Sequence, residues 1–252
     1  MKRKITILTI AFLSSMLMYA NAFAAATGRC GDSITWTLDD SGNLTLSGSG
    51  EMWNYGYVTS PFKDYGIKTV TIEYGITSIG ESAFLGCRGM TKLTLPNSVT
   101  SIGGNAFEGC SGLTELTLPN SVTSIADDAF HGCRGLTELT LPNSVTSIGD
   151  GAFRGCRGLT KLTLPNSVTS IGESAFYLCS GLSKITSLAE IPPVCGSGVF
   201  DGVNKTNCKL IVPIVSVIAY KQAEVWNEFS NIKGFSGVEV TVADKTRKIV
   251  VE

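Results

Sequence analysis

The sequence predicts a β-rich solenoid in which 23-residue coils stack through short parallel strands and short helical turns. Three near-identical segments fill 99–121, 122–144 and 145–167 without an insertion. In each segment, alternating leucines are followed by a proline, and the segments before and after the array depart from the repeat as caps would. One coil cannot bury its own leucines, so we expect the coils to stack around a continuous core.

The N-terminal segment, 1–24, is expected to be a signal peptide. It combines a basic start, "MKRK", with the apolar run "ITILTIAFLSSMLMY" and with small residues in "ANAFA" that fit cleavage after Ala22 or Ala24. The alternative, an N-terminal membrane anchor, is less favoured because the apolar run is short for a bilayer span. No second apolar run is long enough for a transmembrane segment in the mature chain.

Residues 25–75 are expected to form an N-terminal β cap and a degenerate first coil. "CGDSITWTLDDSGNLTLSGSGEMWNY" has two alternating stretches around the turn sequence "DDSGN", a pattern typical of a β-hairpin. "PFKDYGIKTVTIEYG" then has Val70 and Ile72 at the positions where later coils have strand leucines. A solenoid needs such a cap because its terminal coil otherwise exposes core side chains.

Five repeats are predicted to fill 76–190. A segment such as "LTELTL" places leucines on the inner side of a short strand that proline ends, and the fifth copy, 168–190, departs from this pattern at its end. "VTSI" predicts a second extended piece, with Val122 and Ile125 inward. "DDAFHGCRG" predicts a short helical turn, because acidic residues lie near its start, an arginine lies near its end and a glycine follows.

Residues 191–234 are expected to form an irregular coil, with two extra residues before its strand, and a helical cap. "SVIAYKQAEVWNEFSNI" predicts an amphipathic helix with Ser216 as its N-cap. One side of this helix would carry Val217, Tyr220, Ala223, Trp226 and Phe229. Residues 235–252 predict a terminal β segment outside the solenoid, a candidate sorting or attachment element.

The repeat L-x-x-L-x-L-P-x-x-V-x-x-I-x-x-x-A-F-x-x-C-x-x resembles the BspA-type, or treponemal-type, leucine-rich repeat. The Ala-Phe pair, the cysteine and the proline all fall in register across 76–190, and both flanks resemble the caps of this family. The family is associated with adhesion to host or matrix proteins and to other cells. The resemblance therefore implies a non-enzymatic bacterial adhesin or protein-binding scaffold, secreted or held at the cell surface.

Two columns of the repeat are assigned to the core. They are Cys87, Cys110, Cys133, Cys156 and Cys179, and Phe84, Phe107, Phe130, Phe153 and Phe176. Thiols stacked in parallel do not converge as zinc ligands must, and their Cβ geometry does not suit disulfides, so buried free thiols are favoured over either alternative. Cys195 and Cys208 are the best candidates for a disulfide, and Cys30 has no obvious partner.

The only histidine, His131, lies two residues from Cys133, which raises the question of a catalytic dyad. The equivalent positions of the other coils hold unrelated residues, namely Leu85, Glu108, Arg154 and Tyr177, so we expect a variable, solvent-facing column. A dyad needs an activated thiolate and an orienting third group. No acid, base or metal-ligand cluster, P-loop or dinucleotide motif is evident, so no enzyme, metal or cofactor is expected.

The outward positions of the strands form two columns that are the candidate binding face. They are Lys92, Glu115, Glu138, Lys161 and Lys184, and Thr94, Thr117, Thr140, Thr163 and Thr186. Glu138–Lys161 and Lys92–Glu115 are placed to pair across strands. Solenoids use such surfaces for protein ligands; the alternatives are a solvating sheet, an ice-ordering threonine array, or a self-assembling structural module. A formal net charge of −1 gives no basic footprint for nucleic acid.

Overall fold

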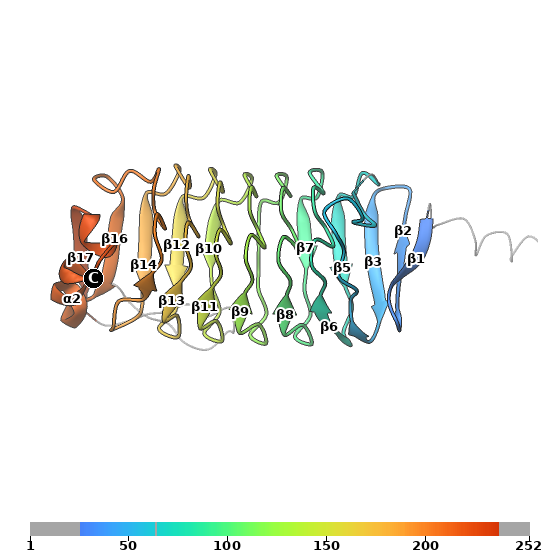
Figure 1. The fold of residues 1–252 in the computed structure, drawn as a ribbon, viewed down its shortest axis with the longest axis horizontal. Coiled ribbons are helices and arrows are strands. Elements are labelled where there is room, and N and C mark those ends of the chain that lie inside the picture. The colour runs from blue at the N-terminus through green and yellow to red at the C-terminus, as the bar shows by residue number, and fades with distance from the viewer. Residues whose placement is uncertain (1–25, 64, 237–252) are drawn as a thin grey trace, which may run out of the picture.

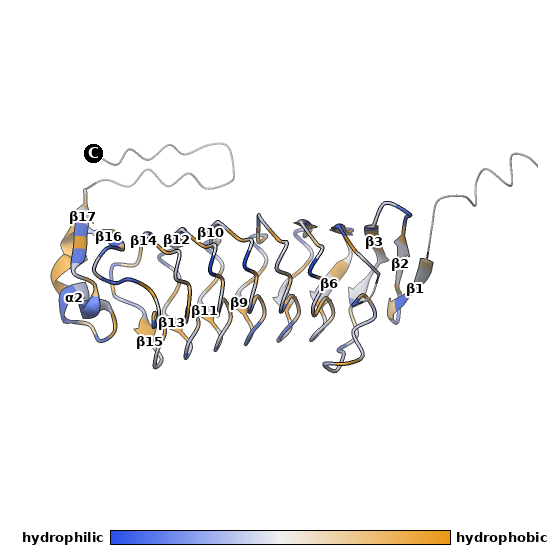
Figure 2. Cartoon of the chain, turned by 90° about the horizontal axis from the view of Figure 1, so that it is seen from above, coloured by the Kyte–Doolittle hydropathy of each residue, from blue (hydrophilic) through white to orange (hydrophobic). Residues whose placement is uncertain are grey.

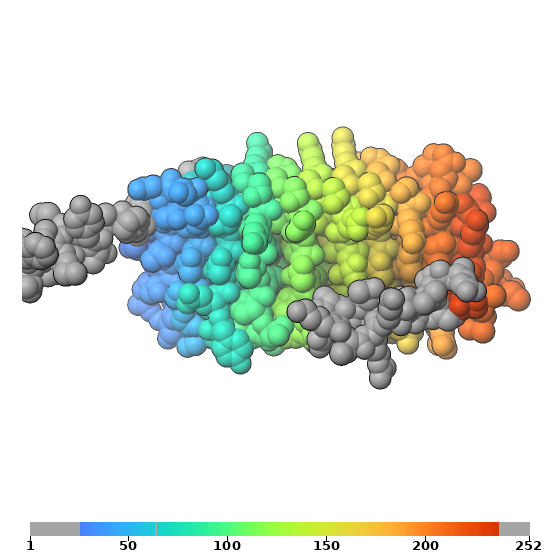
Figure 3. Space-filling model, turned by 180° about the vertical axis from the view of Figure 1, so that it is seen from behind, coloured from blue at the N-terminus to red at the C-terminus, as the bar shows by residue number. Residues whose placement is uncertain are grey.

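The computed structural model describes residues 26–63 and 65–236, and these form an elongated stack of coils (Figure 1). Each coil of the array has three sides: a strand, a second and shorter strand, and a series of turns. The space-filling view shows the coils as contiguous layers from one end to the other (Figure 3). Equivalent residues of successive repeats therefore lie side by side, and the predicted solenoid is confirmed.

The first side of the coils is built from parallel strands in which leucines point inward. Glu138 pairs with Lys161 and Leu139 with Leu162, so the register equals the sequence period. No strand is assigned to the equivalent residues 114–118, and this gap divides the sheet into two parts. The strands are β5 (Thr69–Ile72), β7 (Lys92–Thr94), β10 (Glu138–Thr140), β12 (Lys161–Leu164), β14 (Lys184–Ser187), β16 (Lys209–Pro213) and β17 (Asn231–Phe235).

The second side carries the shorter strands of the "VTSI" type, also paired in parallel. Ile148 pairs with Ile125 on one side and with Ile171 on the other, and all three side chains are buried. These strands are β4 (Gly50–Glu51), β6 (Ile76–Ile79), β8 (Ser101–Ile102), β9 (Ser124–Ile125), β11 (Ser147–Ile148), β13 (Ser170–Ile171) and β15 (Val194–Cys195).

The third side, predicted as short helical turns, consists of tight turns instead, with no helix assigned. Alternate backbone N–H groups of the turn donate hydrogen bonds to the next coil. Phe130 donates to the carbonyl of Ala152 at 2.8 Å, and Gly132 donates to that of Arg154 at 2.7 Å. Gly132 has a φ of +72°, which is left-handed backbone that favours glycine. Bonds between coils thus replace the i→i−4 bonds of a helix, and the helix-dipole argument does not apply.

A column of phenylalanines runs through the core from one cap to the other. The rings of Phe62, Phe84, Phe107, Phe130, Phe153, Phe176 and Phe200 stack with centroids 5.0–5.6 Å apart and planes within 15°. Trp36 meets the first ring edge-on, and Trp226 and Phe229 close over the last. In Figure 2, hydrophobic residues recur at equivalent places in successive coils. Both caps therefore cover the core with aromatic side chains.

The N-terminal cap contains the predicted hairpin, formed by β2 (Ile34–Leu38) and β3 (Asn43–Gly48). Asp39 fixes its turn by accepting hydrogen bonds from the backbone N–H groups of Ser41 and Asn43. A further antiparallel strand, β1 (Ala26–Gly31), which the sequence did not indicate, covers the outer edge of β2. β3 then pairs in parallel with β5, which joins the cap to the first coil.

The C-terminal cap is helical but does not form one long helix. It contains η1 (Ile214–Ser216), which runs directly into α2 (Val217–Gln222), and η2 (Trp226–Glu228); residues 223–225, including Val225 at a φ of +69°, separate α2 from η2. Ser216 lies at the predicted N-cap of α2 but makes no side-chain capping bond. The interruption lets Tyr220 and Trp226 both reach the core, where Tyr220 bonds Ser187 and Trp226 bonds the carbonyl of Pro193. β17, also not predicted, follows and extends the sheet.

The irregular coil before this cap absorbs its extra residues at two separate places. Ile171 pairs with Cys195, which lies one position beyond the repeat period, and Lys184 pairs with Lys209, which lies two positions beyond it. The expected signal peptide, 1–24, lies outside the described residues. Of the expected terminal β segment, 235–252, the structure describes Phe235, which ends β17, and Ser236.

Candidate functional site

The outward side chains of the first strand side form the surface that we call the strand face. The structure places the predicted columns side by side where strands pair: Glu138, Lys161 and Lys184 lie in register, as do Thr140, Thr163 and Thr186. Lys209 on β16 continues the charged column beyond the predicted set. The ten predicted residues are exposed or half-buried, while the leucines between them are buried.

Charge along the strand face is uneven. Glu138 and Lys161 form an ion pair between exposed side chains, as predicted. The other predicted pair, Lys92–Glu115, is not formed within the described residues, because residues 114–118 lack the ladder that would hold Glu115 opposite Lys92. Lys184 and Lys209 lie in register on adjacent strands, and neither makes an ion pair with a described residue. The C-terminal half of the strand face is therefore basic.

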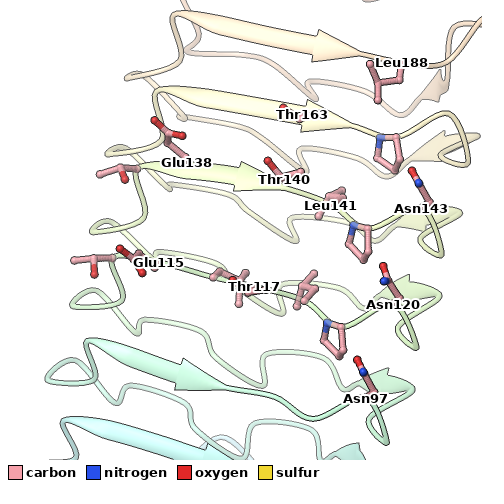
Figure 4. A pocket seen from close by; sticks show the side chains of 17 residues that line it. Asn97, Glu115, Thr117, Asn120, Glu138, Thr140, Leu141, Asn143, Thr163 and Leu188 are labelled. Atoms are coloured by element: carbon pink, nitrogen blue, oxygen red, sulfur yellow. The ribbon is translucent and has the colours of Figure 1, made fainter. Parts of the chain in front are cut away.

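A shallow groove of 830 Å³ crosses the middle of the strand face (Figure 4). Thr117, Thr140 and Thr163 lie along its floor, between glutamates at one side and a column of asparagines at the other. Prolines from the "LPNS" segments complete the asparagine side, which contains Asn97, Asn120, Asn143, Pro119, Pro142 and Pro165. The prolines were predicted only as strand ends and the asparagines were not singled out, although their recurrence at the repeat period was the available signal.

The cysteine column is buried, and each thiol has a hydrogen-bond acceptor in the preceding coil. Cys133 Sγ lies 3.4 Å from the carbonyl oxygen of Phe107, and Cys156 Sγ lies 3.3 Å from that of Phe130. Burial raises the pKa of the Cys156 thiol to about 12 and that of Cys133 well above its ordinary range. These thiols are protonated, weakly nucleophilic parts of the core.

No disulfide is present among the described residues. All eight cysteines are free thiols, including the pair considered for a disulfide. Cys208 is buried, whereas Cys195 is half-buried and its Sγ lies 3.7 Å from the carbonyl oxygen of Pro193. The Cys195–Cys208 bond is therefore not formed in this structure.

His131 faces carboxylates, not the thiol two residues away. Its Nδ1 lies 3.4 Å from Glu108 Oε1 and 3.7 Å from Asp128 Oδ1, while the Cys133 thiol points to a core carbonyl. The variable column is also less uniformly exposed than predicted, because Leu85 is buried. The His131 side chain thus points away from the core and the Cys133 thiol points into it, so the two residues do not form a catalytic dyad.

Neither a metal-binding cluster nor a membrane-spanning helix is found in the part of the chain that the structure describes. No group of three or more histidine, cysteine or carboxylate residues there is placed to hold a metal ion. None of the helices in 26–63 and 65–236 is long and apolar enough to cross a bilayer.

Parallel 23-residue coils with inward leucines and an extended polar face define a leucine-rich-repeat scaffold. The family model for the BspA type leucine rich repeat region matches this chain in six copies, over residues 59–183 and 102–212. These matches cover more than half of the chain, so the chain belongs to the BspA-type leucine-rich repeat family.

Solved structures agree with this assignment. A leucine rich cell surface protein from Faecalibacterium prausnitzii has 28% sequence identity and a TM-score of 0.55; the match covers 75% of this chain and 55% of that one. The T. pallidum leucine rich repeat protein has 25% identity and a TM-score of 0.51, over 69% of this chain and 89% of that one. The pneumococcal vaccine antigen PcpA shares the fold, at 22% identity and a TM-score of 0.51, over 81% of this chain and 46% of that one. No curated protein matches the chain.

Proposed function

We propose that this chain is an exported, non-enzymatic scaffold of the bacterial cell surface, an adhesin that binds a host matrix protein or another cell-surface protein. The observation that carries the proposal is the strand face, where polar columns run across consecutive coils and end in a basic half. Membership of the BspA-type family and similarity to a leucine rich cell surface protein support this function. The scaffold needs no cofactor and no metal.

The basic half of the strand face favours an acidic partner segment. Like charges directly opposite each other on neighbouring strands are destabilising, yet Lys161, Lys184 and Lys209 lie in register. Only Lys161 has a carboxylate partner among the described residues. A partner that brings carboxylates to Lys184 and Lys209 relieves this repulsion and gains from complementary charge.

The strand face is also rigid, which favours binding to an extended surface. Outside the columns, threonine and serine hydroxyls donate hydrogen bonds from coil to coil: Thr160 Oγ1 lies 3.0 Å from the carbonyl oxygen of Thr137, and Ser183 Oγ lies 3.1 Å from that of Thr160. Such bonds hold neighbouring strands at a fixed spacing. A surface ordered before binding avoids much of the entropy loss of ordering loops.

A binding assay with immobilised fibronectin, laminin and collagen tests the proposal. The mature protein is compared with the double variant Lys161→Glu, Lys184→Glu, and with a matched double reversal, Lys63→Glu, Lys221→Glu, at exposed positions away from the strand face. We expect the first variant to lose binding by about tenfold or more and the second to retain it. Absence of binding to all three proteins would contradict a host-matrix ligand, and an equal loss in both variants would contradict the strand face as the binding surface.

Fractionation of the producing cells tests export. We expect the protein in the surface or medium fraction, shortened at the predicted cleavage site after Ala22 or Ala24. Full-length protein confined to the cytosol would show that 1–24 does not direct export.

A self-assembling structural module is the second candidate, and the distribution of exposed apolar side chains favours it. Every exposed large hydrophobic residue in the described chain lies outside the 76–190 array. They are Trp53, Tyr57, Val58, Tyr65 and Tyr74, and Ile191, Val194, Ile214, Val215 and Ile218. Apolar groups concentrated toward the two ends suit contacts between molecules. Sedimentation velocity at high concentration decides between the candidates, because a strict monomer excludes self-assembly.

A further inference from the structure

The N-terminal cap contains a second concave site, away from the strand face. A hollow of 480 Å³ is lined by residues 32–33 and 49–54, which connect β1 to β2 and β3 to the segment after β4. Trp53 contributes to its wall and is 42% exposed, whereas Trp36 and Trp226 are buried. Small-molecule sites typically have volumes of about 300–1,000 Å³ and combine an aromatic surface with a few placed polar groups.

The indole of Trp53 is held in one orientation. Its Nε1 donates a hydrogen bond to Asp32 Oδ1 at 3.0 Å, and its backbone N–H donates to the carbonyl of Cys30 at 2.8 Å. Gly80 packs so closely against Trp53 that a Cβ there would lie 1.9 Å from the Trp53 carbonyl oxygen. Two segments, 30–32 and the one around Gly80, therefore position the Trp53 backbone, and Asp32 orients the indole before any ligand binds.

Polar groups around the indole are available to a ligand. Asn54 Oδ1 accepts a hydrogen bond from the backbone N–H of Glu81 at 2.8 Å, which fixes the amide and leaves its Nδ2 as a donor. Asp32 has a second carboxylate oxygen, and Glu51 adds another carboxylate. Within the described residues, no hydrogen bond engages Asn54 Nδ2, Asp32 Oδ2 or the Glu51 carboxylate.

We propose that this hollow binds a neutral sugar residue of a glycan, with the pyranose ring stacked on Trp53. The C–H groups on one face of a pyranose carry partial positive charge and suit the electron-rich face of the indole. Its hydroxyls donate to Asp32 and Glu51 and accept from Asn54 Nδ2. The two carboxylates disfavour acidic sugars. This site is separate from the strand face and does not depend on the function proposed above.

Other ligand classes fit the hollow less well. An apolar peptide anchor needs a buried apolar pocket, but Met52 is only 4% exposed and the indole is the one large apolar surface available. A calcium ion takes about six to eight oxygen ligands, and no cluster of three or more metal-ligating side chains occurs among the described residues.

The intrinsic fluorescence of Trp53 provides a direct test, because the other two tryptophans are buried. The mature protein is titrated with chitohexaose, cellohexaose, xylohexaose and mannohexaose. We expect at least one to give a saturable change in emission, with a dissociation constant in the millimolar range or below. No change with any of the four at millimolar concentration overturns the proposal.

Calorimetry on variants with native circular dichroism locates the binding. Trp53→Ala should abolish it, Trp53→Phe should retain part of it, and Asp32→Asn should weaken it by about tenfold. Tyr74→Ala, at an aromatic residue outside the hollow, is the matched control and should bind as wild type. Unchanged binding in both Trp53 variants, or tighter binding of 3′-sialyllactose than of the neutral sugars, would overturn the assignment.

Discussion

The ring of Phe130 stacks on that of Phe107 in the preceding coil, with centroids 5.2 Å apart and planes inclined by 9°. Phe130 makes the same contact with Phe153 on its other side, at 5.4 Å. Each phenylalanine within the array thus packs against two coils at once. Dispersion and aromatic contacts between coils, rather than within them, hold the column together.

Truncation of this ring should be strongly destabilising. Phe130→Ala opens a cavity that the rigid neighbouring coils cannot fill, so we expect a loss of about 3–5 kcal/mol in the free energy of unfolding. Tyr74→Ala, at an 81% exposed aromatic position, should cost no more than about 0.5 kcal/mol. Urea denaturation followed by circular dichroism measures both, and similar losses would contradict the role of the stacked column.

The buried thiols should make stability fall at high pH. Burial raises the pKa of Cys156 in the folded chain from its ordinary 9.0 to about 12. The unfolded chain therefore releases this proton above about pH 9, while the folded chain retains it until about pH 12. The stability contribution is complete below pH 9 and is lost as the pH rises through this window, at up to about 1.4 kcal/mol per pH unit for each such thiol.

Comparison with Cys156→Ala isolates this effect from lysine and tyrosine titration. The free energy of unfolding is measured by urea denaturation at several values between pH 8 and pH 11. We expect the slope against pH to be shallower in the variant by about one thiol's contribution. Equal slopes would mean that the folded-state pKa of Cys156 is not raised.

The Glu138–Lys161 ion pair should contribute little to stability. Its side chains are 60% and 58% exposed, respectively, and exposed pairs typically contribute about 0.2–1 kcal/mol. Glu138→Gln should therefore lose less than about 1 kcal/mol, and the loss should disappear at about 1 M salt because the charges are screened. Glu115→Gln, at the equivalent position without an ion pair, is the matched control, and a salt-dependent loss there would contradict this assignment.

The Tyr220 hydroxyl should stabilise the C-terminal cap. It lies 2.7 Å from Ser187 Oγ and donates to the carbonyl of Ala189 at 3.0 Å, in a fully buried position. Tyr220→Phe leaves both groups without this partner, so we expect a loss of about 1–3 kcal/mol in chemical denaturation. Tyr74→Phe removes an exposed hydroxyl and should have no measurable effect. Equal stability of Tyr220→Phe and wild type would indicate that water replaces the lost contacts.

Much of the fold was predictable because the residue pattern of one repeat applies to every coil. Once a single repeat folds into one coil, every copy places the same residue type beside its equivalent, and a column such as Phe107 and Phe130 follows from the period alone. The same reasoning predicted that Glu138 and Lys161, which lie one period apart, are neighbours on adjacent strands. It also indicated that His131 occupies a variable position, while Cys133 belongs to a column that recurs without a histidine.

The sequence by itself thus determined the solenoid, its inward columns and the outward columns of the strand face. Only the tertiary structure decided how the turns of each coil are hydrogen-bonded, and which side chains meet where the repeat is imperfect or absent. Alternate N–H groups around Phe130 bond to the next coil, so turns replace the expected helix. The α-helix ends at Gln222, and Trp226 and Phe229, which follow Val225 with its positive φ, cover the last phenylalanine of the column. Asp32 and Trp53 meet across the cap, a contact between distant segments that no periodicity encodes.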